Sequence, residues 1–278
     1  MQPRLTLSFI LALAFAFCPC TVVESQTTGP ENGSLILVGG GQIEDSIYKQ
    51  FIELAGGSES LIVIIPTAGT RNEFGSDWNG LQPLKAAGAL NLRVLHTRDR
   101  AESESFEFND SLTQAGGVWI TGGRQWRLVD SCLNTRVHRE LGNLLIRGGV
   151  IAGSSAGATI QGSFLVRGDT EGNELMMGDH LEGMAFLKNS AVDQHLLRRN
   201  RQFDLIPVIE KHPHLLGIGL DEGTVILVQR NQCRVMGKTY VAFYDHEKMK
   251  STGAPFELLA TGQKYDLVKR QRISARRR

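Results

Sequence analysis

The sequence is poor in cysteine, with only four in 278 residues. Two of them, Cys18 and Cys20, lie within an apolar segment at the N-terminus. Cys132 and Cys233 remain, too few for the disulfide framework that holds many small secreted proteins together. We therefore expect two buried free thiols and a fold that depends on its hydrophobic core.

Neither sign of charge is in excess, because 30 basic and 29 acidic residues give a net charge of +1. This balance gives no indication of the broad basic face by which proteins bind nucleic acid. A Walker-type lysine motif is absent, and Glu44 stands where a dinucleotide-binding loop that starts at Gly39 needs its last glycine. The sequence predicts no cofactor, no metal and no nucleic-acid partner.

Long apolar runs are also lacking, apart from residues 5–17, which follow Arg4. A basic residue before a short apolar stretch is typical of a signal peptide, whereas a membrane span needs about 20 apolar residues. We predict a signal peptide over residues 1–25, cleaved near Ser25, with an uncleaved anchor as the alternative. The mature chain would be exported, either secreted or periplasmic, without a membrane span.

Residues 26–278 have a length that suits a single α/β domain. Their last part, about 269–278, is a basic cluster that we expect to be solvated and mobile.

Short apolar runs that end in glycine alternate with segments of helical periodicity. The strands are expected at 34–38, 61–65, 92–95, 117–120, 149–152, 215–220, 224–228 and 235–244, and the helices at 43–55, 78–87 and 125–145. This alternation predicts an α/β fold of three layers, with a mainly parallel sheet and helices on both faces. Active sites in such folds lie at the carboxyl ends of the strands.

Residues 153–157 fit the pattern Gly-x-Ser-x-Gly, directly after a run typical of a buried strand. In that pattern a serine, here Ser155, sits on a sharp turn between strand and helix with its hydroxyl exposed. The N–H of Ala156 would point at the same spot and hold a developing oxyanion. The alternative is a glycine-rich turn with two solvated serines.

A serine nucleophile needs a base, and the base needs a carboxylate that orients it. Among seven histidines, His195 stands out because it lies between an apolar stretch and a dense group of polar residues. Glu222 and Asp221 follow a strongly apolar predicted strand, where either could orient a histidine or form a solvated turn. Gly123 could bring a second backbone N–H to the oxyanion, or serve only as a turn residue.

Four motifs in order along the chain carry a resemblance to a known family. They are Thr121-Gly122-Gly123-Arg124-Gln125, Gly153-Ser154-Ser155-Ala156-Gly157-Ala158, Asp193-Gln194-His195 and Gly217-Ile218-Gly219-Leu220-Asp221-Glu222. Together they resemble the cyanophycinase branch of the peptidase S51 family. The likeness runs from about residue 33 to about 228.

The resemblance implies a class I glutamine amidotransferase-like fold, with Ser155 as nucleophile, His195 as base and Glu222 as the third catalytic residue. The family positions that hold substrate are matched by Gln125, Asp193, Gln194, Arg199 and Arg201. A further arginine of the family pattern is Asp204 here, so we expect weaker action on the polymer cyanophycin, improved by Asp204→Arg. The resemblance also suggests a homodimer.

The implied reaction is serine-dependent hydrolysis of a β-aspartyl peptide or polymer through an acyl-enzyme. One rival is an α/β-hydrolase esterase, whose chain order of serine, acid and histidine would be met by Ser155, Asp221 and His246. A second rival is a non-catalytic binding protein on the same fold.

Overall fold

The computed structural model describes residues 26–75 and 78–274. The predicted signal peptide lies outside these described residues. Within them, no helix is long and apolar enough to cross a lipid bilayer.

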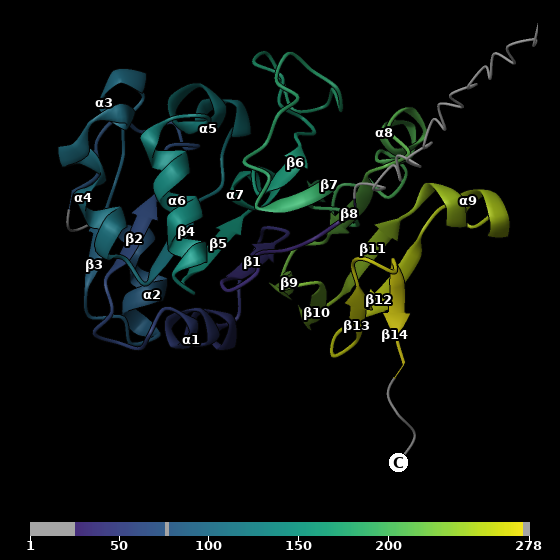
Figure 1. Cartoon of the computed structure of the whole chain (residues 1–278), viewed down its shortest axis with the longest axis horizontal. Coiled ribbons are helices and arrows are strands. Elements are labelled where there is room, and N and C mark those ends of the chain that lie inside the picture. Colours follow the sequence, from purple (N-terminus) through teal and green to yellow (C-terminus); the bar gives the residue numbers. More distant parts are fainter. Residues whose placement is uncertain (1–25, 76–77, 275–278) are drawn as a thin grey trace, which may run out of the picture.

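The larger sheet of the described chain has nine strands, with the first strand of the sequence in the middle (Figure 1). From one edge to the other it consists of β14 (Gln271–Ile273), β13 (Lys264–Asp266), β10 (Gln232–Gly237), β9 (Thr224–Gln229), β1 (Ser34–Val38), β5 (Val150–Ser154), β4 (Gly117–Ile120), β2 (Ile62–Ile65) and β3 (Leu92–Val94). The strands from β1 to β3 run parallel, which confirms the predicted α/β class. The strands from β9 to β14 extend the sheet in antiparallel fashion, which the sequence analysis did not predict.

Helices cover both faces of the parallel part, as predicted (Figure 1). One face carries α1 (Asp45–Leu54) and α2 (Gln82–Ala86), which follows the short 3-10 helix η1 (Asn79–Leu81); the other carries α3 (Arg100–Glu104), α4 (Phe106–Gln114), α5 (Gln125–Cys132) and α6 (Arg136–Ile146). Successive side chains of a strand point to opposite faces. Ile36 accordingly packs with Phe51 of α1, whereas Leu37 packs with Leu141 of α6.

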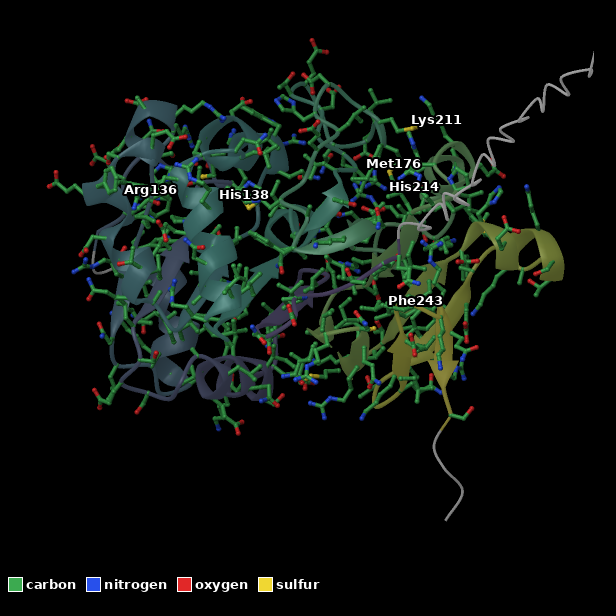
Figure 2. The ribbon with its side chains drawn as sticks, viewed as in Figure 1. Arg136, His138, Met176, Lys211, His214 and Phe243 are labelled. Atoms are coloured by element: carbon green, nitrogen blue, oxygen red, sulfur yellow. The ribbon has the colours of Figure 1, made fainter. Side chains whose placement is uncertain are left out.

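A second, five-stranded sheet lies beside the antiparallel wing. Its order is β12 (Glu257–Ala260), β11 (Tyr240–Tyr244), β8 (Leu216–Leu220), β7 (Leu187–Gln194) and β6 (Gly162–Phe164), and it is accompanied by α7 (Ala156–Thr159), α8 (Ile206–Lys211) and α9 (His246–Thr252). One face contributes Ile218 and Phe243 to the same apolar core as Val228 of the large sheet. Phe243 is labelled in Figure 2. The carboxyl ends of β7 and β8 can therefore meet the end of β5.

Two predicted regions are divided in the structure. The single strand expected over 235–244 is β10 and β11 in different sheets, because the chain turns at Gly237 with φ +90°. A Cβ there would lie 2.1 Å from the carbonyl oxygen of Gly223, so only glycine fits. The region 125–145 was predicted to hold one or two helices, and it holds two, α5 and α6, with the chain turning between them at Asn134, whose φ is 58°.

The C-terminal segment differs from the predicted mobile tail. Residues 271–273 form β14 and pair with β13. Just before them, Arg270 donates a hydrogen bond to Asp245 at 3.1 Å and another to the carbonyl oxygen of His214. Backbone pairing and these bonds hold residues 270–273 in place, while Gln271 and Arg272 are exposed to solvent as predicted, and residues 275–278 lie outside the described residues.

Cys132 and Cys233 are free and buried, as predicted. Burial raises the pKa of each thiol to about 12. Both therefore stay protonated and serve as small apolar core residues.

Candidate active site

Ser155 occupies a sharp turn between β5 and α7, as the sequence predicted. Its backbone has φ 54° and ψ −114°, and its N–H donates to the carbonyl oxygen of Val38 at 2.9 Å. Such a conformation costs about 1–3 kcal/mol in a residue with a side chain. The flanking glycines permit it, because a Cβ on Gly153 would lie 2.0 Å from the carbonyl oxygen of Gly157.

The chain from β7 brings His195 to this turn. The Nε2 atom of His195 lies 3.0 Å from Oγ of Ser155. Its Nδ1 atom lies 2.7 Å from Oε1 of Glu222, which follows β8. Three residues that are far apart in the sequence thus form one hydrogen-bonded chain of hydroxyl, imidazole and carboxylate.

Asp221, the neighbouring carboxylate, has a different place. Its Oδ1 accepts hydrogen bonds from the N–H groups of Leu197 and Arg198, both at 2.9 Å. Its Oδ2 accepts one from the hydroxyl of Thr239 at 3.2 Å. Asp221 therefore holds the backbone that follows His195, and Glu222 alone reaches the imidazole.

The imidazole of His195 is a weaker base than an exposed histidine. Burial lowers its pKa, the positive charge of Arg199 lowers it further, and Glu222 acts in the opposite direction. A lowered pKa keeps the ring neutral near neutral pH, which is the form that can accept a proton.

The triple glycine after β1 lies directly beneath these side chains. A Cβ on Gly40 would come 2.4 Å from Cε1 of His195, and one on Gly41 would come 2.8 Å from Oε2 of Glu222. The sequence placed Gly39 to Gly41 at the carboxyl end of a predicted strand, where active sites lie in such folds. Their contact with His195 and Glu222 was not predicted, and it explains the glycines, because the backbone here approaches functional groups closely.

The two segments that carry the predicted oxyanion N–H groups lie next to Ser155. Ala156 is the first residue of α7, so its N–H has no acceptor within the helix. The loop of Gly122 and Gly123 passes beside the serine, since a Cβ on Gly122 would lie 3.2 Å from Cβ of Ser155. Gly123 has φ +148° and packs against the carbonyl of Ala68, which excludes a side chain there.

Four of the five residues predicted to hold substrate are buried and make contacts inside the protein. Gln125 is buried and donates to the carbonyl oxygen of Val166 at 3.1 Å. Asp193 is fully buried and pairs with Arg167. Gln194 accepts a 2.9 Å hydrogen bond from Arg201, which is 3% exposed. These contacts satisfy the four buried side chains within the protein.

Arg199, the fifth of these residues, is exposed and close enough to His195 for its charge to lower the imidazole pKa. Across residues 26–75 and 78–274, no hydrogen bond or ion pair involves its guanidinium. It is the predicted substrate residue that faces the solvent side of the site.

The structure corrects the expectation for Asp204. Its Oδ2 accepts a 2.6 Å hydrogen bond from Nη2 of Arg167, so it is not a free negative charge beside the substrate. Arg167 was missed, because it lies in the loop after β6 without periodicity or motif.

The other histidines that were considered stay apart from Ser155. His246 on α9 lies 3.1 Å from the side chain of Glu247. His138 on α6, labelled in Figure 2, lies 2.9 Å from the carbonyl oxygen of Met184, and the ring of His214, in the loop after α8, packs edge-on against that of His212. The serine, acid and histidine order of an esterase is therefore not assembled. Among the residues that the structure describes, no cluster of His, Cys, Asp or Glu is arranged to hold a metal ion.

Fold and side chains together define a hydrolase with a serine, a histidine and a carboxylate at the carboxyl edge of an α/β sheet. The profile of peptidase family S51 matches residues 35–236. The cyanophycinase of Trichormus variabilis is 31% identical over 243 residues, covering 84% of this chain and 80% of that protein. That of Geminocystis herdmanii is 30% identical over 226 residues, covering 79% of this chain and 83% of that protein. The chain belongs to peptidase family S51 and is a serine-type peptidase.

Solved structures share the fold. A peptidase from an acI-B1 actinobacterium superposes with a TM-score of 0.64 at 23% identity, covering 86% of this chain and 98% of its own. A Listeria monocytogenes protein described as a putative peptidase E gives a TM-score of 0.53 at 16% identity, covering 74% and 99%. These neighbours confirm the predicted class I glutamine amidotransferase-like fold.

Proposed function

We propose that this protein hydrolyses β-aspartyl linkages through an acyl-enzyme on Ser155. The observation that carries the proposal is the continuous chain from Oγ of Ser155 to His195 at 3.0 Å and on to Glu222 at 2.7 Å. Its similarity to cyanophycinases supports the choice of linkage.

In the first step His195 Nε2 takes the hydroxyl proton as Oγ of Ser155 attacks the side-chain carbonyl of the aspartyl residue. The N–H groups of Ala156 and Gly123 stabilise the oxyanion, and Glu222 stabilises the imidazolium. His195 then gives the proton to the leaving amine, which departs and leaves an ester on Ser155. Water, activated by the same imidazole, hydrolyses that ester and restores the serine.

A negative charge on the substrate distinguishes a β-aspartyl linkage from an ordinary peptide bond. A β-aspartyl bond leaves the α-carboxylate free beside the scissile carbonyl, whereas an ordinary peptide bond consumes it. Arg199 is the exposed cation next to His195 and can hold that carboxylate in a bidentate manner.

Two further proposals concern the whole protein. We propose that it is exported, because Arg4 and the apolar residues 5–17 have the composition of a signal peptide. N-terminal sequencing of the mature protein should start near residue 26, and an intact Met1 or a cytoplasmic location would reject export. A homodimer is expected from the family resemblance, and light scattering at the mass of one chain would reject it.

The deciding experiment incubates the purified protein with cyanophycin, a panel of β-aspartyl dipeptides and the matching α-aspartyl dipeptides. Products are identified by mass spectrometry, with Ser155→Ala as the inactive control. Cleavage of β-linked but not α-linked substrates supports the proposal. Binding without turnover would favour the binding protein, and turnover of simple esters alone would favour the esterase.

A further inference from the structure

Arg167 is a buried cation that the proposed reaction does not use. It lies in the loop between β6 and β7, and its side chain is 0% exposed. Its guanidinium forms a fork on the carboxylate of Asp193, with Nε donating to Oδ1 at 2.8 Å and Nη2 to Oδ2 at 2.9 Å. Nη2 also donates to Asp204 at 2.6 Å, and Nη1 donates to the carbonyl of Asn173 at 3.0 Å. A desolvated arginine in such a place needs these partners, and each partner is fixed in return.

The two carboxylates lie at opposite ends of one segment. Asp193 stands two residues before His195, and Asp204 closes the segment just ahead of α8. Between them lie His195 and Arg199, the base and the exposed cation of the site. Arg167 therefore contacts both ends of the segment 193–204, which we call the base segment.

The near end leads directly to His195. Oδ1 of Asp193 accepts not only from Arg167 but also from the backbone N–H of Gln194 at 2.9 Å. The next residue, His195, has φ 57° and turns the chain out of β7. The ion pair thus stabilises the turn that aims the imidazole at Ser155.

Backbone hydrogen bonds make the base segment compact. The N–H of Arg199 donates to the carbonyl of His195 at 3.0 Å, that of Arg201 to Leu196 at 2.7 Å, and that of Asp204 to Arg201 at 3.0 Å. A segment bonded in this way moves as a unit. Asp221 holds its middle through the N–H groups of Leu197 and Arg198, and the contacts at its two ends complete its placement relative to Ser155.

We propose that Arg167 is a positioning residue that clamps both ends of the base segment and so fixes the spacing between His195 and Arg199. The inference rests on the proposed function for its kinetic meaning. It assigns the two ends separate effects: the Asp193 end controls the alignment of the base, and the Asp204 end controls where Arg199 meets the substrate carboxylate.

The test uses three variants and a β-aspartyl dipeptide. Asp204→Asn weakens only the far end, so we expect KM to rise about tenfold with kcat within about twofold of wild type. Arg167→Met releases both ends, so kcat should also fall, by about tenfold or more. Arg167→Lys retains the charge but lacks the fork and should rescue only part of this loss.

The matched control is Arg270→Met. Arg270 is also an arginine that joins a carboxylate, Asp245, to a carbonyl oxygen, that of His214, but it does so beside β14. We expect it to lower the melting temperature while KM and kcat stay unchanged. A purely structural Arg167 would behave in the same way, and that result would overturn the inference.

A second measurement does not depend on the substrate. Hydrogen–deuterium exchange in folded protein should show faster exchange at the amides of Arg199 and Arg201 in Arg167→Met and Asp204→Asn, but not in Arg270→Met. Unchanged exchange at the amides of Arg199 and Arg201 in Arg167→Met would reject the proposal that Arg167 holds the base segment. Failure of wild type to cleave any β-aspartyl substrate would instead reject the proposed function, and exchange would still decide the role of Arg167.

Discussion

Gly40 lies directly against the imidazole of His195, so that a Cβ at position 40 would come 2.4 Å from Cε1 and 2.9 Å from Nδ1 of the ring. The main chain beside β1 thus forms the wall that keeps the base over Ser155. No side chain fits between this wall and the ring.

Gly40→Ala should therefore push the imidazole away from Ser155. We expect kcat to fall about 100-fold or more, since a displacement of about 1 Å in a catalytic group has that effect. The control is Gly57→Ala, where φ is +101° but a Cβ meets nothing within 4 Å. Both variants carry the backbone cost of a positive φ. Equal losses of kcat would therefore contradict the claim that the backbone at Gly40 holds the His195 ring in place.

Asp204→Arg should damage the protein rather than improve its action on cyanophycin. The new guanidinium would face that of Arg167, which is 0% exposed and would lose one of its two carboxylate partners. We expect a loss of about 1–3 kcal/mol in the free energy of unfolding and a melting temperature lower by several degrees. A variant that is as stable as wild type and degrades the polymer faster would restore the view that Asp204 is a free charge.

The rate should fall at acid pH with a midpoint below the usual histidine value of about 6.5. The reason is that burial and then Arg199 lower the pKa of His195, and only the neutral ring accepts a proton. Arg199→Gln removes a cause that lowers this pKa, so the acid limb of kcat/KM should move to higher pH. Glu222→Gln removes a cause that raises the pKa of His195, so the acid limb of the residual activity should move to lower pH.

Opposite shifts in the two variants are the informative outcome. A common shift, or an acid limb of wild type above about 6.5, would show that another group controls the profile.

Ser155→Ala and His195→Ala should each lower kcat by several orders of magnitude, as in other enzymes with this set of residues. Ser154→Ala should retain substantial activity, because Ser155 holds the tip of the turn. His246→Ala should be nearly silent, since its ring lies beside Glu247. Loss of activity in His246→Ala with an active His195→Ala would reinstate the esterase order.

Sequence patterns were most informative where a structural feature depends on residues that are neighbours in the sequence. Buried parallel strands read as short apolar runs, and the turn at Ser155 needs small neighbours, so both could be predicted from consecutive residues. The placement of Glu222 rather than Asp221 depended on which carboxylate faces His195 across two strands. Local sequence left both open, and only the family resemblance favoured Glu222.

The features that were missed depend on contacts between distant segments. Arg167 belongs to a loop, and its partners Asp193 and Asp204 lie 26 and 37 residues further along the chain. Nothing near position 167 indicates that its charge is satisfied. For the same reason a cluster of basic residues at the C-terminus suggested a mobile tail, although residues 271–273 pair with β13.

The central position of β1 has a consequence for how the chain is made. Ser34 pairs with Val150 on one side and with Gln229 on the other, and the latter lies 195 residues away. Residues 35–38 are almost wholly inaccessible in the finished protein. The strand that is synthesised first is thus enclosed only after β9 has emerged, and until then it presents a bare apolar edge. The central sheet can therefore be completed only when most of the polypeptide exists, and such long-range pairing is intrinsically slow to form.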